Sequence, residues 1–154
     1  MPTKEQRHVW MGMARLVSHL SHVANDAIEA AAGISLSEMT LMGQVRALDG
    51  SARMVDLASR LGVSKAAITK LVDSLERSGY LKRGTDPNDR RVSRIALTIT
   101  GAKIASRAGA SFEASMQDGL WDHMTKKETA EMLQTLEKIQ AKIGLRRGGV
   151  LPPQ

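Results

Sequence analysis

Residues 63–94 hold the side chains of this chain whose types and spacing suit a chemical task. The spacing of the apolar positions predicts an amphipathic helix, and its inner face is formed by Ile68, Leu71, Val72 and Leu75. The opposite face then carries hydroxyl, small and cationic side chains, namely Ser64, Lys65, Ala66, Thr69, Lys70 and Ser74. Cations reach phosphates or guanine edges, and short side chains fit against base edges and thymine methyl groups. The free backbone N–H groups at the Ser64 end favour a phosphate there. The stretch therefore predicts contact with DNA.

A basic hairpin is expected directly after this helix. Residues Tyr80–Thr85 and Val92–Thr98 are interpreted as two strands, and the run 86–89 between them is rich in turn-forming residues. The tip carries Arg90 and Arg91. A planar, always-charged guanidinium at a hairpin tip suits the narrow minor groove of DNA and its negative potential.

A flexible arginine loses entropy when it docks, so a neighbouring carboxylate is expected to brace it. The candidates are Asp73 on the helix and Asp89 in the loop, and we favour Asp73 with Arg91. The alternative is that the helix face and the arginine pair are ordinary solvated surface. Their adjacency, in this order and in the most basic part of the chain, favours a function.

The distribution of charge supports this interpretation. The chain has 154 residues, a formal net charge of +6 and a pI near 10.0. The segment from Arg53 to Arg94 contains ten cations and five anions, a net charge of +5, so the basicity belongs largely to one module. A localised basic patch is typical of nucleic-acid binding.

Composition narrows the class of protein further. There is no cysteine, which excludes disulfides, thiolate metal sites and a thiol redox switch. We expect no signal peptide and no membrane segment, and therefore a cytoplasmic protein. No glycine-rich phosphate loop, nucleophile–base pair or closed carboxylate pair is present, so we expect neither an enzyme nor a bound cofactor.

Helices are expected to flank the basic module on both sides. The apolar spacing predicts one helix over 4–32, and a second that begins after Ser35 or Ser37 and ends at Asp49-Gly50. A short helix is expected between Ser51 and Gly62, so that it and the following helix form a helix-turn-helix. Two more are expected after the hairpin, from about Gly101 to Trp121 and after Thr125, whereas the tail 148–154 has no helical option. The fold class expected is mainly α with a small β-hairpin (α+β).

The run Leu57–Arg83, followed by Asp86–Arg91 and by Leu97–Gly101, resembles the MarR family of winged helix-turn-helix regulators. The resemblance covers nearly the whole chain. It implies a single MarR-like domain over 1–154, a winged helix-turn-helix part over 35–99, and dimerisation helices over 4–32 and 100–146. It also implies an obligate homodimer that binds a pseudo-palindromic operator, usually as a repressor. Lys65-Ala66 stands where the family often has Arg-Pro, which bears on base specificity but not on the binding mode.

The end helices support dimerisation independently of the family. Their apolar faces are larger than a small winged helix can cover, and a second copy of the chain would bury them. Two recognition helices would then lie about 34–36 Å apart, to meet successive major grooves. The alternative is that these helices cover the core of their own chain.

The sequence gives the least information on the effector that would control such a protein. The resemblance implies a small, often aromatic or phenolic effector. Met13, Arg15 and Met42 are the candidate effector-binding residues, although such methionines are more often plain core. His19, His22 and Asp26 share one helix face at metal-ligand spacing, but Arg15 extends the same stripe and argues against a metal. The alternatives to a ligand-responsive repressor are a metal-responsive regulator and an architectural DNA-coating protein of low sequence specificity.

Overall fold

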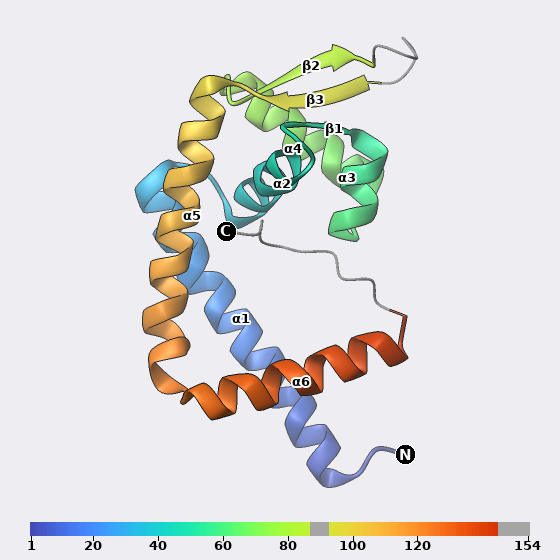
Figure 1. Ribbon diagram of the computed structural model, residues 1–154, viewed down its shortest axis with the longest axis vertical. Helices are drawn as coiled ribbons and strands as arrows, with labels where there is room; N and C mark the ends of the chain where they lie inside the picture. The colour runs from blue at the N-terminus through green and yellow to red at the C-terminus, as the bar shows by residue number, and fades with distance from the viewer. Residues whose placement is uncertain (87–92, 145–154) are drawn as a thin grey trace.

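A computed structural model of the chain describes residues 1–86 and 93–144, and Figure 1 shows how they are arranged. The order of its elements is α1 (Lys4–Ala32), α2 (Leu36–Ala47), β1 (Ser51–Arg53), α3 (Met54–Leu61), α4 (Lys65–Arg77), β2 (Leu81–Thr85), β3 (Ser93–Leu97), α5 (Ile99–Gly119), the 3-10 helix η1 (Trp121–His123) and α6 (Lys126–Lys142). The predicted fold class, mainly α with a small β-hairpin, is confirmed. Asp89, Arg90, Arg91 and the tail 148–154 lie outside the described residues.

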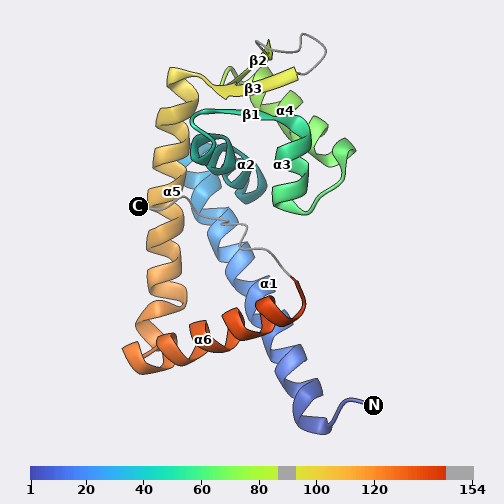
Figure 2. The same cartoon turned by 45° about the vertical axis from the view of Figure 1, so that its right-hand side comes forward.

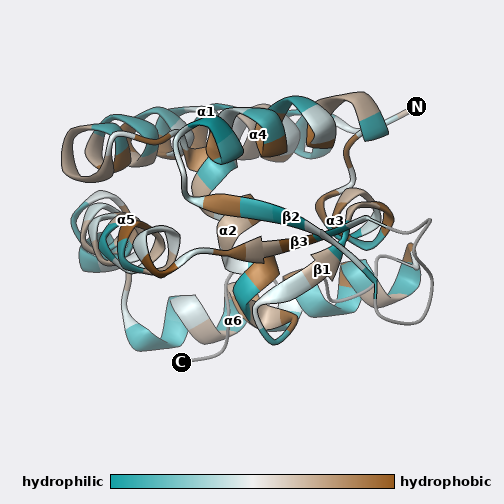
Figure 3. Cartoon of the chain, turned by 90° about the horizontal axis from the view of Figure 1, so that it is seen from above, coloured by the Kyte–Doolittle hydropathy of each residue, from teal (hydrophilic) through white to brown (hydrophobic). Residues whose placement is uncertain are grey.

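The molecule has a head at one end and a pair of long helices that lead away from it (Figures 1 and 2). The head contains α2, α3, α4 and the sheet. Helix α5 runs from the sheet to the far end, and α1 packs against it. Seen along the vertical axis, α1 and α6 lie on opposite sides of the molecule (Figure 3).

Side-chain caps fix where most of the helices begin. Thr3, Ser35 and Thr125 each form a capping box with the residue three positions later. In such a box, the hydroxyl and the later side chain each satisfy a free backbone N–H group of the first turn. The structure thus selects Ser35 over Ser37, and it confirms Thr125 as a cap. Helix α1 ends at Gly33, whose φ of 68° is the left-handed conformation that glycine adopts without strain.

The sheet contains a third strand that the sequence did not indicate. We expected Ser51 to precede a helix directly, but Ser51–Arg53 forms β1, and the strand order is β1-β3-β2 with both pairs antiparallel. Ala52 lies opposite Ile95, and both side chains are buried. The three residues of β1 show no alternation of polar and apolar side chains. They form a strand because they pair with β3, more than forty residues away, and bury Ala52 there.

The start of α5 is fixed to the end of α4. Thr98 caps α5, and its hydroxyl donates to the carbonyl of Gly79 (2.8 Å), while its backbone N–H donates to the carbonyl of Tyr80 (3.0 Å). Gly101 passes so close that a Cβ there would lie 1.9 Å from the Tyr80 oxygen. The long helix is therefore joined to the head by a close backbone contact.

The core lies in the head and in the adjoining halves of α1 and α5. Its fully enclosed side chains are aliphatic or sulfur-containing, among them Ile28, Leu41, Met42, Leu57, Ile68, Leu75 and Ile95. Figure 3 shows apolar character along β3, the central strand. Packing of α2 and α3 against this strand, and of α4 against α2, α3 and β2, sets the position of the helix-turn-helix.

Helix α6 contributes nothing to this core. Every one of its 17 residues is exposed, although one face carries Met132, Leu133, Leu136 and Ile139, with Ile143 just beyond its end. The first half of α1 is similar, with Val9, Trp10, Met13, Leu16 and Val17 exposed. No helix in the described ranges is long and apolar enough to cross a membrane.

Candidate nucleic-acid interface

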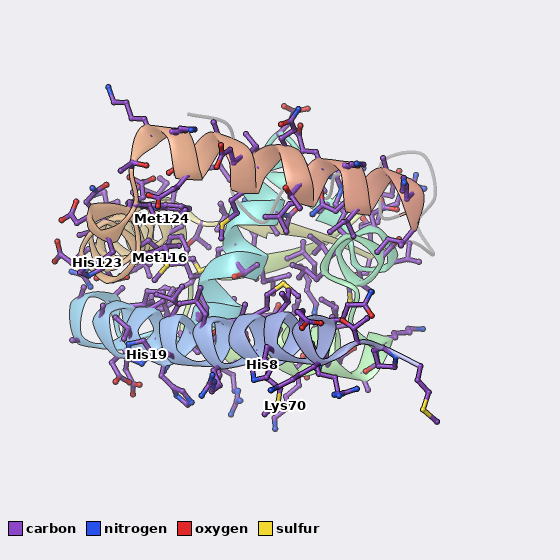
Figure 4. The ribbon with its side chains drawn as sticks, turned by 90° about the horizontal axis from the view of Figure 1, so that it is seen from below. His8, His19, Lys70, Met116, His123 and Met124 are labelled. Atoms are coloured by element: carbon purple, nitrogen blue, oxygen red, sulfur yellow. The ribbon has the colours of Figure 1, made fainter. Side chains whose placement is uncertain are left out.

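The outward face of α4 forms a shallow hollow. Its lining residues are Lys65, Ala66, Thr69, Lys70, Asp73 and Arg77. Lys65, Ala66 and Lys70 are exposed, and Figure 4 shows Lys70 at the outer edge of the molecule, pointing away from the body. Four of the predicted contact residues therefore share one accessible surface, which alternates cations with short side chains.

The inward face of α4 holds this surface in place. Ile68, Val72 and Leu75 are buried in the head core. At the start of the helix, the Ser64 hydroxyl accepts a hydrogen bond from the backbone N–H of Ala67 (3.2 Å), so this residue serves as the N-cap. The Thr69 hydroxyl donates to the Lys65 carbonyl (2.9 Å), which leaves its methyl group and oxygen lone pairs for an outside partner.

Ser74 lies apart from the other predicted contact residues. It is half-buried, and its hydroxyl donates to Oε1 of Glu38 on α2 (2.7 Å). The sequence placed Ser74 on the outward face, but the helix turns this position towards α2. Burial alone would raise the pKa of Glu38, but hydrogen bonds from Ser35 and Ser74 together outweigh it and lower the pKa, so the acceptor is a carboxylate at neutral pH.

A first ion cluster joins α4 to β2 of the hairpin. Arg83 forms ion pairs with Asp73 and with Glu76, the latter at 3.4 Å. Arg83 lies opposite Ile95 in the sheet, and cross-strand neighbours share a face, so the arginine is on the helix-facing side. The sequence predicted Asp73 as a brace through Arg91; the described partner is Arg83, and Arg91 and Asp89 lie outside the described residues.

A second ion cluster closes the base of the hairpin. The Asp86 side chain is 1% exposed, and its Oδ2 accepts from Arg53 Nε (3.3 Å) and from Arg94 Nη1 (3.0 Å). Arg94 also donates to the hydroxyl of Ser51 (3.0 Å) and to its carbonyl (3.1 Å). Arg53 and Arg94 face each other across β1 and β3, which is unfavourable for like charges unless a carboxylate lies between them.

Sequence reasoning missed most of these supporting residues. Arg77 could have been found, because it lies four and eight positions after Asp73 and Thr69 on the same helical face. Arg83 and Arg94 were counted as cations but were given no partner. The local signal of Glu38 is its capping box with Ser35, and it gave no sign of the partner on α4, which is 36 residues away.

The candidate effector residues do not come together. Met13 and Arg15 are exposed on the first half of α1, whereas Met42 is fully enclosed in the head core. His19, His22 and Asp26, the alternative metal face, do not form a ligand set either. Across residues 1–86 and 93–144, no three His, Asp or Glu side chains lie close enough together to hold one ion. Figure 4 shows His8 and His19 spaced along α1.

Comparison with known proteins identifies the family. Residues 33–93 match the model of the MarR family. Over 58% of its length, the sequence is 35% identical to the multiple antibiotic resistance protein MarR of Salmonella typhimurium, of which 59% is covered. Residues 33–93, which include the helix-turn-helix, belong to the MarR family. The chain spans about half of the length of the curated relatives that it matches, with 59% in the Salmonella case.

Solved MarR-type structures share the fold over almost the whole chain. Sco3205, a MarR family transcriptional regulator from Streptomyces coelicolor solved in complex with DNA, aligns with a TM-score of 0.82 at 21% identity, covering 99% of this chain and 95% of its own. The organohalide-sensing regulator RdhR, solved in its 2,4-dichlorophenol-bound form, aligns with a TM-score of 0.81 at 15% identity, covering 100% and 95%. The head with its hairpin is thus the winged helix-turn-helix of this family.

Proposed function

We propose that this MarR-family protein is a dimeric, sequence-specific DNA-binding regulator of transcription, that it acts as a repressor, and that it works in the cytoplasm. The basic hollow on α4 carries this proposal. It presents Lys65, Lys70 and Arg77 beside Ala66 and Thr69 on a helix whose other face is locked into the core. Such a face suits the major groove, with cations for phosphates or guanine edges and short side chains for the base edges between them.

The hairpin extends the same surface. Its two ion clusters fix β2 against α4 and tie β1 to β3, so the tip residues start from a fixed base. We assign Arg90 and Arg91 at that tip to the minor groove, as their charge and place in the sequence suggest.

Dimer formation is supported by α6 and the first half of α1. Most of the stability of a helix in a protein comes from packing of its apolar face, and α6, with 17 residues, buries none of them in its own chain. Its exposed stripe needs a cover, and a second copy supplies one through a symmetric contact. Two heads would then face one pseudo-palindromic operator.

The DNA-binding proposal is tested with duplexes selected by the full-length protein from a random library. Binding is titrated over a series of salt concentrations. A variant that no longer reaches one phosphate should show a slope of log K against log salt that is smaller by about 0.9. We expect Lys70→Ala to weaken binding and flatten the slope by about this amount, while Lys126→Ala, which removes the same charge from α6, leaves both unchanged.

A lack of any enriched sequence, with equal affinity for bulk DNA, would instead indicate an architectural DNA-coating protein. Equal slopes for Lys70→Ala and the wild type would refute the assignment of α4 as the DNA-reading helix.

The dimer is tested at the apolar stripe of α6. Leu136→Glu places a charge at its centre, whereas Gln134→Glu adds the same charge on the opposite face of the helix. Sedimentation analysis should show monomers for Leu136→Glu and dimers for Gln134→Glu and the wild type. A dimeric Leu136→Glu protein would place the interface elsewhere.

We also propose that a small effector of phenolic type releases the DNA. Exposed Met13 offers an adaptable apolar surface, Arg15 supplies a cation on the same helix, and RdhR gives a precedent for a phenol on this fold. The probe is 2,4-dichlorophenol added to the protein–DNA complex. Loss of binding, reduced in Met13→Ala, supports the proposal, and an unchanged complex at saturating phenol contradicts it.

A further inference from the structure

The hydrogen bond between Ser74 and Glu38 belongs to a longer chain of polar contacts that begins on α1. Asn25 on α1 accepts the backbone N–H of Leu36 at the start of α2 (3.0 Å). The neighbouring Ser35 donates to Oε2 of Glu38 through its backbone N–H (2.9 Å) and its hydroxyl (3.0 Å). The other oxygen of Glu38 accepts the Ser74 hydroxyl on α4. The first turn of α2 therefore contacts α1 on one side and the DNA-reading helix on the other.

The Glu38 carboxylate makes the second of these connections. Glu38 is half-buried; one of its oxygens accepts from Ser35, the cap of its own helix, and the other accepts from Ser74 on α4, so it fixes α4 relative to the capped end of α2. Hydrogen bonds to an ionised acceptor are shorter and stronger than neutral ones, and the 2.7 Å distance to Ser74 agrees with this. The apolar face of α4 holds the helix in the core, and a directional polar bond adds a further constraint on its rotation and sliding.

We propose that Glu38 and Ser74 are positioning residues for DNA recognition, and that they set the orientation of α4 relative to α1 without touching DNA. This inference rests on the proposed function. In the dimer described above, α1 belongs to the pairing region, so the Ser74–Glu38 bond helps to fix how the two reading helices are presented to the operator. It also explains why a serine on a DNA-reading helix has a half-buried hydroxyl.

The test compares two nearly isosteric replacements. Ser74→Val removes the hydroxyl, and Ser74→Thr keeps it, with the same branching at Cβ in both. We expect Ser74→Val to bind its selected operator about tenfold more weakly, the equivalent of about 1.4 kcal/mol. Ser74→Thr should bind like the wild type, and both should bind a random duplex with unchanged affinity, because non-specific binding depends on charge.

A double-mutant cycle separates positioning from direct contact. Glu38→Ala removes the acceptor but keeps the backbone bond from residue 38 to Ser35 that caps α2. If Ser74 acts through Glu38, Ser74→Val should cause no further weakening in the Glu38→Ala background. A full additional weakening there would mean that Ser74 contacts the DNA itself, and wild-type affinity of Ser74→Val would also overturn the inference.

Hydrogen exchange on the free protein tests the same bond without DNA. Backbone amides of α4 near Ser74 should exchange faster in Ser74→Val than in Ser74→Thr. Equal rates would overturn the positioning role even if no operator is found. Absence of selective DNA binding by the wild type, with a difference in exchange rates, would instead overturn the proposed function alone.

Discussion

Gly101 has a packing role that its place inside a helix would not suggest. A methyl group at this position would meet the carbonyl oxygen of Tyr80 at 1.9 Å, and neither the Cβ nor this backbone oxygen can rotate away. We expect Gly101→Ala to lower the free energy of unfolding by about 1–3 kcal/mol, the usual cost of forcing atoms into a filled space. Urea titration measures it.

The control for this change lies in the same helix. At Gly109 an added Cβ has no neighbour within 4 Å, so Gly109→Ala should stabilise the protein by about 0.5–1 kcal/mol through the better helix propensity of alanine. Opposite changes in the free energy of unfolding for the two alanine variants would locate the constraint at Tyr80. Equal changes would contradict a packing constraint at Gly101.

Glu38 makes stability depend on acid pH. Its pKa is lowered from the ordinary value of 4.5, so its contribution is complete above about pH 4.5 and is lost as the pH falls through its folded pKa. Wild type and Glu38→Gln should therefore differ most in unfolding free energy near neutral pH and converge in acid. Denaturation at several pH values checks this, and a constant difference would contradict it.

At the scale of elements, the first ion cluster, which joins β2 to α4, should affect DNA binding more than folding. Arg83, Asp73 and Glu76 are each between 37% and 47% exposed, and pairs of this kind contribute about 0–1 kcal/mol to stability. Arg83→Gln should thus melt almost normally. Its operator affinity should fall on the order of tenfold, because a hairpin that is free to move must be ordered on binding.

Arg107→Gln is the matched control, since it removes the same charge from an exposed position of α5. Fluorescence anisotropy with the selected duplex measures the affinities. An equal decrease in affinity in both variants would indicate a general charge effect, and the first ion cluster would then have no special role in binding.

Elements with a local signal were predictable, and those with a distant partner were not. Helix α1 begins and ends where its apolar spacing and Gly33 indicate, and the helix-turn-helix follows from its own stripe. Strand β1 was missed because it exists through pairing with β3. In the site, the outward residues of α4 could be predicted from helical periodicity, whereas the partners of Ser74, Arg83 and Asp86 depend on how separate elements meet.

At the scale of the whole molecule, the proposed dimer predicts that folding depends on protein concentration. If α6 and the first half of α1 are stable only when a second copy covers them, unfolding releases two chains and the equilibrium follows mass action. The melting temperature should rise with protein concentration for the wild type and for Gln134→Glu. Calorimetry over a hundredfold range tests this, and a constant melting temperature would contradict it.

Asp86 also has a consequence for how this protein can diverge. This residue directly follows β2, and its carboxylate holds Arg94, the second residue of β3. The two strands of the hairpin are thus anchored to each other at Asp86 and Arg94, whatever the residue types at 87–92. We therefore expect substitutions in 87–92 to leave the sheet folded. Under the minor-groove role proposed for Arg90 and Arg91, duplicated copies of the gene would diverge in DNA preference through these six residues, and an engineer could exchange them as a cassette.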